Sequence, residues 1–231
     1  MYQLFIANKN YSSWSLRPWI LMRQLQIPFE EKIFSFGSRA FRDFSPSGRV
    51  PCLHDGDIVI WDSLAIVEYL AERHGSVWSE DKKIRAWERS AAAEMHSGFN
   101  ALRQYCSMNC GLRVRLNECP DALQRDILRI EELWTEGLER FGGPYLSGSQ
   151  FHAADAFFAP VAFRVNTYGL KLDEAASGYV RTLLALPAMQ NWYEAALLEP
   201  WRDLAHEAEI LQFGTILEDM RPTGIDSGTA E

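Results

Sequence analysis

The stretch that decides the fold is Tyr11-Ser12-Ser13-Trp14-Ser15-Leu16-Arg17-Pro18-Trp19. It follows a short apolar run at residues 4–7, which predicts a strand, and it leads into a helical pattern over residues 16–25. We expect this helix to begin just before Pro18, because a residue of the first turn needs no amide donor. The serines therefore stand where a loop enters a helix, and helix starts stabilise anions through free amides and a partial positive charge. A serine cap explains one of the three hydroxyls well and the other two less well.

Two later runs carry further signals at element boundaries. Gly48-Arg49-Val50-Pro51-Cys52-Leu53 precedes a hairpin that Asp55-Gly56-Asp57 predicts. A trans Val50–Pro51 bond is the common state, whereas a cis bond would present the main chain of Val50 to a strand-like ligand. Trp61-Asp62-Ser63-Leu64 opens the next helix. An acid beside a hydroxyl suits helix capping there, and it also suits a ligand that carries an ammonium and a carboxylate.

The sequence pattern divides the chain into two domains. Residues 1–78 predict the order βαβαββα, and this α/β part carries no net charge. Residues 79–231 carry the whole net charge of −8 and predict an all-α domain. The expected helices cover residues 81–105, 121–141, 153–168, 178–185, 188–198 and 201–212. The polar end, residues 221–231, is expected to be a flexible tail.

Composition argues against several classes of protein. The 231 residues are 47% hydrophobic and 23% charged, and no apolar stretch is long enough to span a membrane. A chain with a net charge of −8 lacks the basic surface that a nucleic-acid partner requires. The four cysteines form no C-x-x-C motif and no zinc-ligand spacing. The sequence therefore predicts no metal site and a reducing, cytoplasmic location.

Together, these runs resemble the thioredoxin-like domain of cytosolic glutathione transferases, above all the zeta class and related bacterial members. The family pattern S-S-C-x-W-R-V-R corresponds to residues 12–19, and Q-V-P-x-L corresponds to residues 49–53. An acid or Gln followed by S-x-A-I-x-x-Y-L corresponds to residues 62–70. The resemblance implies the glutathione transferase fold, in which an α/β thioredoxin-like N-terminal domain (βαβαββα) precedes an all-α helical C-terminal domain. It also implies a homodimer, with the second-substrate site in the helical domain.

The same resemblance assigns residues to the binding of glutathione. Val50, on a cis bond to Pro51, would bind the cysteinyl main chain, and Asp62 and Ser63 would hold the γ-glutamyl end. Arg49 stands where the zeta-like pattern has Gln. It fits a pairing with the glycine carboxylate, and it fits a solvated loop position equally well.

Ser12 matches the first serine of the family pattern and is the first candidate to donate a hydrogen bond to the glutathione sulfur. Ser13 is the next candidate. A free thiol has a pKa of about 8.5, and lowering that pKa by ~2 units requires about 2.7 kcal/mol of preference for the thiolate. A hydrogen bond to a charged acceptor supplies roughly 1.5–3 kcal/mol, and a helix N-terminus supplies roughly 0.3–2 kcal/mol. The hydrogen bond and the helix N-terminus together suffice to lower the thiol pKa by this amount without a general base.

Four residues are candidates for the second-substrate pocket: Trp14, Phe99, Arg103 and Arg164. Trp14 replaces the family's cysteine, which disfavours thiol–disulfide exchange, although a core or interface position suits this residue equally. Phe99 and Arg103 lie four apart on one face of the expected helix, a pattern that packing also produces. The arginine that zeta-class isomerases use falls near Thr167, about one turn after Arg164, so an isomerase of that type is disfavoured.

The resemblance thus implies a glutathione S-transferase that activates glutathione as a thiolate. The thiolate would be used for conjugation to, or isomerisation of, a small electrophile. Two alternatives stay open, namely a binding or interaction module of this fold with little turnover, and a glutathione-dependent peroxidase. The sequence does not identify the physiological electrophile.

Overall fold

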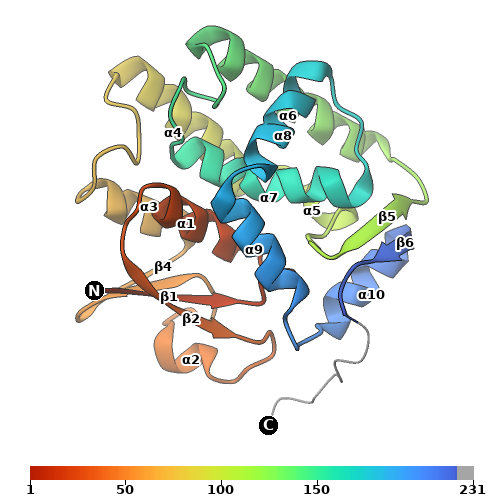
Figure 1. Ribbon diagram of the computed structural model, residues 1–231, viewed down its shortest axis with the longest axis horizontal. Helices are drawn as coiled ribbons and strands as arrows, with labels where there is room; N and C mark the ends of the chain where they lie inside the picture. Colours follow the sequence, from red (N-terminus) through yellow and green to blue (C-terminus); the bar gives the residue numbers. More distant parts are fainter. Residues whose placement is uncertain (223–231) are drawn as a thin grey trace.

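A four-stranded mixed sheet organises the N-terminal part of the chain in the computed structural model, which describes residues 1–222 (Figure 1). Its strands are β1 (Tyr2–Ala7), β2 (Phe29–Phe34), β3 (Cys52–Asp55) and β4 (Ile58–Trp61), in the order β2-β1-β3-β4. β1 pairs parallel with β2 and antiparallel with β3, and β3 forms a hairpin with β4. The helices of this part are α1 (Ser13–Gln24), α2 (Phe41–Phe44) and α3 (Ser63–Ala71). This is the predicted order, and the thioredoxin-like domain is confirmed.

The central strand β1 is followed by a short loop and then by the start of α1. Leu4 and Ile6 of β1 are fully buried, so the strand is fixed in the core. α1 begins at Ser13, and Pro18 lies inside the helix rather than in its first turn, so the expected helix start was wrong. The earlier start follows from Ser12, which acts as the N-cap and accepts a hydrogen bond from the amide of Ser15.

Helices dominate the second part of the chain. They are α4 (Lys82–Ser97), α5 (Asn100–Tyr105), α6 (Asp121–Phe141), α7 (Ala153–Tyr168), α8 (Glu174–Leu184), α9 (Pro187–Leu197) and α10 (Leu204–Phe213). Nearly all residues of α7 are buried, and α7 packs against α1, α4 and α8. Figure 1 shows α7 in the middle of the helices, above the N-terminal sheet. The contact between α7 and α1 is therefore a main connection between the two parts of the chain.

The single helix expected over residues 81–105 is interrupted. α4 ends at Ser97, and Phe99 has a φ of 56°, which lies in the left-handed region, before α5 begins. Gly98 donates its amide to the carbonyl of Glu94, and a Cβ at Gly98 would lie 2.8 Å from that carbonyl oxygen. The close approach explains why the break falls at a glycine.

A small sheet in the second part was not expected from the sequence. β5 (Leu112–Leu116) pairs antiparallel with β6 (Gly214–Asp219), and the two strands lie side by side in Figure 1. A Cβ at Gly214 would lie 2.5 Å from Cγ1 of Val114, so the strands approach closely at this glycine. The C-terminal domain is therefore helical, as predicted, with one two-stranded sheet added to it.

The C-terminal segment is anchored at least as far as Arg221. This side chain is buried, and its guanidinium pairs with Glu207 and with Asp219. The expectation of a flexible tail over residues 221–231 is therefore wrong for Arg221, because the expectation ignored the two carboxylates from α10 and β6. Pro222 is exposed, and residues 223–231 of that segment lie outside the described residues.

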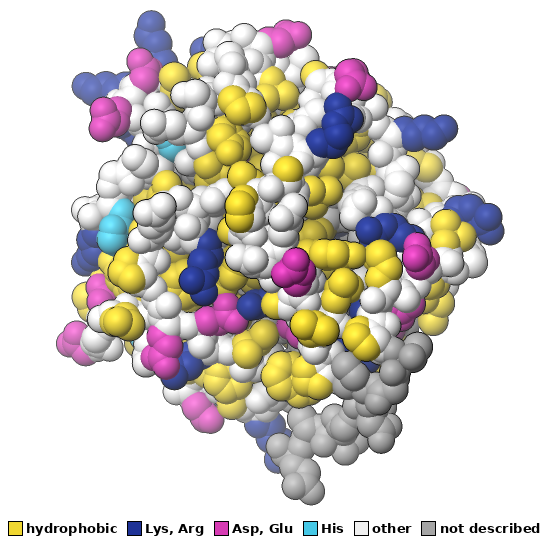
Figure 2. All heavy atoms as spheres, in the orientation of Figure 1, with side chains coloured by type: hydrophobic (Ala, Val, Ile, Leu, Met, Phe, Trp, Pro, Cys, Tyr) yellow, Lys and Arg dark blue, Asp and Glu magenta, His cyan; other side chains and the backbone are white. Residues whose placement is uncertain are grey.

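The surface seen in Figure 2 mixes charges of both signs. Lys and Arg side chains are interspersed with Asp and Glu side chains on this face, and neither sign gathers into one broad patch. Among the described residues, no helix combines the length and the apolar character that crossing a membrane requires.

Candidate active site

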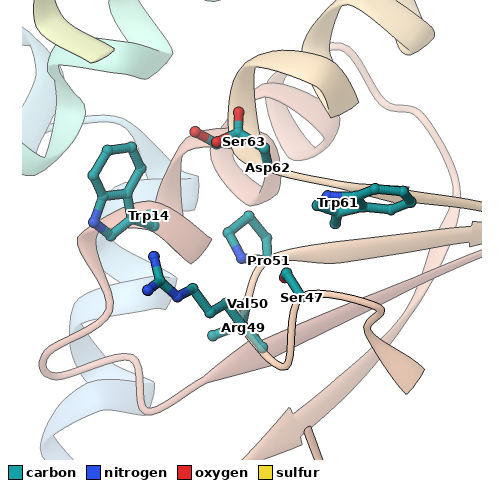
Figure 3. A pocket seen from close by; sticks show the side chains of 8 residues that line it. All are labelled: Trp14, Ser47, Arg49, Val50, Pro51, Trp61, Asp62 and Ser63. Atoms are coloured by element: carbon teal, nitrogen blue, oxygen red, sulfur yellow. The ribbon is translucent and has the colours of Figure 1, made fainter. Parts of the chain in front are cut away.

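Two adjoining pockets open at the junction of the sheet and the helices. The first, which we call the sheet pocket, has a volume of about 390 Å³ (Figure 3). Its lining residues are Trp14, Ser47, Arg49, Val50, Pro51, Trp61, Asp62 and Ser63. The second, the interdomain pocket, has a volume of about 240 Å³. Its lining residues are Tyr11, Ser12, Ser13, Trp14, Phe36, Val50, Arg103, Ser107, Met108, Arg164 and His206. Trp14 and Val50 line both pockets, so the two meet there.

The sheet pocket brings together the five residues that the sequence resemblance placed around glutathione: Arg49, Val50, Pro51, Asp62 and Ser63. The bond between Val50 and Pro51 is cis, as the resemblance implied. Val50 precedes β3, so its main-chain groups lie just beyond the strand ladder. Figure 3 shows Asp62 and Ser63 at the first turn of α3, on one side of this pocket.

Asp62 has an unusual backbone conformation for a residue with a side chain. Its φ is 76°, and its Oδ1 accepts a hydrogen bond of 2.8 Å from the amide of Leu64, which caps α3. Oδ2 lies 3.4 Å from Nε2 of His96. Strained backbone of this kind persists where the surrounding structure fixes it, and it concentrates at binding sites. The carboxylate is nearly half exposed toward the pocket and is available to a cation.

Ser63, the first residue of α3, is fully buried and accepts a hydrogen bond of 3.4 Å from Nη1 of Arg17. The Arg17 guanidinium stacks on the Trp14 ring at 4.1 Å and lies 5.0 Å from the centre of the Phe157 ring. Its Nε and Nη2 have no hydrogen-bond partner within residues 1–222. Burial, followed by repulsion from two other arginines, lowers the pKa of Arg17 well below its usual value.

The two candidate serines at the start of α1 have different hydrogen-bond partners. The Ser12 hydroxyl donates to Oγ of Ser15 at 2.7 Å and accepts from the Ser15 amide at 3.4 Å. Oγ of Ser13 accepts a hydrogen bond of 3.5 Å from Nη2 of Arg164. Within residues 1–222, the Ser13 hydroxyl proton has no acceptor, so this hydroxyl can still donate to a ligand.

Arg103 and Arg164 contribute positive charge to the interdomain pocket. Arg164, on α7, is 4% exposed, and burial followed by repulsion from Arg103 lowers its pKa to about 10. Arg103, on α5, donates to the carbonyls of Gly98 and Met95, and its guanidinium lies 4.8 Å from the centre of the Trp14 ring. The pocket therefore combines a helix start, a hydroxyl and two cations, an arrangement that stabilises an anion.

One sequence-based candidate does not reach either pocket. Phe99 is 7% exposed, belongs to the hydrophobic core and lines neither the sheet pocket nor the interdomain pocket. The helix break at Gly98 removes Phe99 from the face that it would share with Arg103 in a continuous helix. The candidates Trp14, Arg103 and Arg164 do line the interdomain pocket.

Sequence reasoning missed three aromatic or imidazole side chains of the interdomain pocket. The rings of Tyr11 and Phe36 lie 5.2 Å and 5.0 Å from the ring of His206, measured between centroids. Tyr11 stands in the decisive stretch and could have been singled out by its place beside the serines. Nothing in the local sequence marks Phe36 or His206, because they meet only through long-range contacts such as that of Tyr11 with Glu207 on α10. Within residues 1–222, no group of three metal-ligating side chains is present.

Comparison with known families gives the family of the chain. A family model described as glutathione S-transferase, N-terminal domain, matches residues 11–73. A second, described as glutathione S-transferase, C-terminal domain, matches residues 85–195. The chain belongs to the glutathione S-transferase family.

Proteins similar to this chain include relatives from a plant and from a bacterium. Glutathione S-transferase Z2 of Arabidopsis thaliana is 27% identical over 65% of this chain and 70% of its own length. Glutathione S-transferase GstB of Escherichia coli K12 is 24% identical over 78% of this chain and 86% of its own. A glutathione transferase homolog from Burkholderia gl BGR1, solved with bound glutathione, has a TM-score of 0.65 and 21% identity. That comparison covers 84% of this chain and 97% of the other, and it shows the glutathione transferase fold.

Proposed function

We propose that this glutathione S-transferase binds glutathione in the sheet pocket and ionises its thiol where that pocket meets the interdomain pocket. The thiolate then serves conjugation to, or isomerisation of, a small electrophile. The observation that carries the proposal is the junction of the two pockets at Trp14 and Val50, with Ser13 on one side and Asp62 on the other. The glutathione present in a structure of the same fold supports this choice of ligand.

The sheet pocket has complementary groups for each end of the tripeptide. In the proposed complex, the Asp62 carboxylate pairs with the γ-glutamyl ammonium, and the Ser63 hydroxyl and the start of α3 bind the adjacent carboxylate. Because Oγ of Ser63 already accepts from Arg17, its own proton remains free for that carboxylate. The main chain of Val50 binds the cysteinyl residue, and Arg49 pairs with the glycine carboxylate.

Ser13, rather than Ser12, is the proposed donor to the sulfur. Each hydroxyl has one proton, and Ser12 uses its proton on Ser15. The proton of Ser13 is free, and Ser13 is also the first residue of α1, where the helix dipole favours negative charge. A thiol pKa lowered by ~2 units requires about 2.7 kcal/mol, which a charge-assisted hydrogen bond and a helix start together supply.

The interdomain pocket is the proposed place of the electrophile, with Trp14, Arg103 and Arg164 in its wall. No cysteine lies at the start of α1, so the proposal favours transfer chemistry over thiol–disulfide exchange. No metal takes part in the proposed reaction.

The proposal includes a cytoplasmic homodimer. Two large apolar side chains of β4, Ile58 and Trp61, are 44% and 47% exposed. They adjoin a groove whose lining includes Val59, Ile60, Leu64 and Ala65. Exposed apolar surface of this kind supports an interface with a second copy.

The test combines glutathione binding by calorimetry, titration of the bound thiolate by its ultraviolet absorbance, and turnover assays. The assays use aryl halides, haloacids, hydroperoxides and maleyl diketo acids as second substrates. We expect a bound thiol pKa well below that of free glutathione, turnover of at least one electrophile, and a higher pKa of the bound thiol in Ser13→Ala. Binding without any turnover would favour the binding module, and turnover of hydroperoxides alone would favour the peroxidase. No binding of glutathione would reject the proposal.

A further inference from the structure

The guanidinium of Arg164 is held in a fixed orientation beside the start of α1. Its Nε donates to the carbonyl of Cys106 at 2.8 Å, and its Nη1 lies 3.5 Å from the carbonyl oxygen of Pro160. Its Nη2 donates to Oγ of Ser13 at 3.5 Å, across the boundary between the two domains. Because the guanidinium is planar, the first two contacts determine where Nη2 points.

The contact with Arg164 restricts the direction of the Ser13 hydroxyl. A hydroxyl oxygen has two lone pairs and one proton, and the Nη2–H of Arg164 occupies one lone pair. The Ser13 proton therefore points away from the Nη2–H group of Arg164. Both residues line the interdomain pocket, so the free side of this hydroxyl is toward a ligand there.

Arg164 is also a buried cation without a counter-ion. It is 4% exposed, and within residues 1–222 no Asp or Glu carboxylate forms an ion pair with it. Its pKa of about 10 keeps it protonated near neutral pH. A buried charge that lacks a partner is costly, and an anion placed beside it offsets that cost.

We propose that Arg164 is a positioning residue for glutathione activation, which orients the Ser13 hydroxyl toward the sulfur and favours the thiolate by its charge. This inference rests on the proposed function. When glutathione ionises, its S–H bond breaks, the electron pair stays on sulfur and the proton leaves to solvent water. Ser13 keeps its proton and donates a hydrogen bond to the sulfur, and Arg164 remains a cation throughout.

The experiment measures the pKa of the bound thiol in Arg164→Gln by thiolate absorbance across a pH series. We expect the pKa to rise by about 1 unit or more relative to the unaltered protein, because a nearby positive charge and an oriented donor are lost together. Affinity for glutathione should fall by about threefold at pH 7, because ionisation of the bound thiol then contributes less to binding. Affinity for S-methylglutathione, which has no ionisable thiol, should be unchanged.

Two comparisons separate this role from a structural one. Arg181→Gln removes an exposed arginine of α8 that pairs with Glu174, and it should leave the thiol titration as it was. In a Ser13→Ala background, Arg164→Gln should shift the thiol pKa by less than it does alone, because only the charge effect remains. An equal shift in both backgrounds would reject the orienting role.

A conservative variant keeps the inference testable where Arg164→Gln does not fold. Arg164→Lys retains the charge but lacks the planar fork, so it cannot hold both the Cys106 carbonyl and Ser13. Its bound thiol pKa should lie above that of the unaltered protein. A thiol pKa that is unchanged in the folded Arg164 variants would overturn the inference while leaving the proposed function intact. If the unaltered protein bound neither glutathione nor S-methylglutathione, the proposed function itself would fail.

Discussion

Nη1 of Arg17 donates to Oγ of Ser63 at 3.4 Å, from a guanidinium that is fully buried. The same relationship recurs between Arg164 and Ser13 at 3.5 Å. In both pairs, a buried arginine occupies a lone pair of a serine at the first position of a helix, and the serine proton stays free. The two serines thus become hydrogen-bond donors at helix starts, one for each pocket. This arrangement suits two anionic groups of one ligand.

Ser63→Ala should weaken glutathione binding by about tenfold or more, because a hydrogen bond to a charged group is worth roughly 1.5–3 kcal/mol. Calorimetry on the folded variant measures this loss. The pKa of the bound thiol should not change, since in the proposed complex Ser63 contacts the γ-glutamyl end of the tripeptide and not its sulfur. Ser90→Ala is the matched control, because Ser90 is exposed on α4 and donates only to the carbonyl of Ala86. An unchanged affinity in Ser63→Ala would show that this hydroxyl does not bind the γ-glutamyl carboxylate.

Asp62→Asn should reduce affinity for glutathione by about tenfold, because the variant loses the charge that pairs with the γ-glutamyl ammonium. Asparagine can still cap α3 through its side-chain oxygen, so the fold is retained. The control is a change in the ligand. Glutaryl-cysteinyl-glycine lacks the ammonium group and should bind the parent and the variant equally. A similar loss of affinity for both ligands would contradict a specific pairing with the ammonium.

Ser12→Ala should lower the free energy of unfolding by about 1 kcal/mol, because the N-cap of α1 is lost. Urea unfolding followed by circular dichroism measures this change. The thiol of bound glutathione should titrate as in the unaltered protein. If Ser12→Ala raised the thiol pKa and Ser13→Ala did not, the roles assigned to the two serines would have to be exchanged.

Glu199 ties the loop before Ser12 to the segment that follows α9. It accepts hydrogen bonds from the amides of Lys9 and Asn10, and burial raises its pKa from 4.5 to about 7. The folded state therefore holds a proton on Glu199 in a pH range where the unfolded chain has released it. The resulting stabilisation is complete below about pH 4.5 and is lost as pH rises through 7.

Glu199→Gln should remove this pH dependence, since an amide does not titrate. Relative to the parent, the free energy of unfolding of the variant should rise by up to about 3 kcal/mol between pH 4.5 and pH 8. Urea unfolding at a series of pH values gives the comparison. Parallel pH profiles for the two proteins would show that Glu199 does not titrate with a raised pKa.

Local signals made the N-terminal part readable from the sequence. Gly56 at the hairpin and the serine and acid caps at helix starts act within a few residues. The order of strands and helices could therefore be predicted from the sequence. The prediction from Pro18 was wrong because the N-cap Ser12 determines where α1 begins, and the missing amide of Pro18 does not. The pairing of β5 with β6 was invisible, since it joins segments about a hundred residues apart.

The site residues that belong to a sequence motif could be predicted. The contacts that depend on how the helices pack could not. Val50, Asp62 and Ser63, which the resemblance assigned to glutathione, line one pocket. The partners of the serines could not be read from the sequence, because the contact of Ser13 with Arg164 depends on how α7 packs on α1. Likewise, Phe99 does not line the pocket in which we expected it, and the helix is interrupted at this residue.

The most direct measurement of the central claim is a structure of this protein with glutathione bound. The account predicts the γ-glutamyl end at Asp62 and Ser63 and the sulfur within hydrogen-bond distance of Oγ of Ser13, nearer to it than to Oγ of Ser12. Glutathione bound with its sulfur directed away from the start of α1, or no glutathione in the sheet pocket at saturating concentration, would contradict the account.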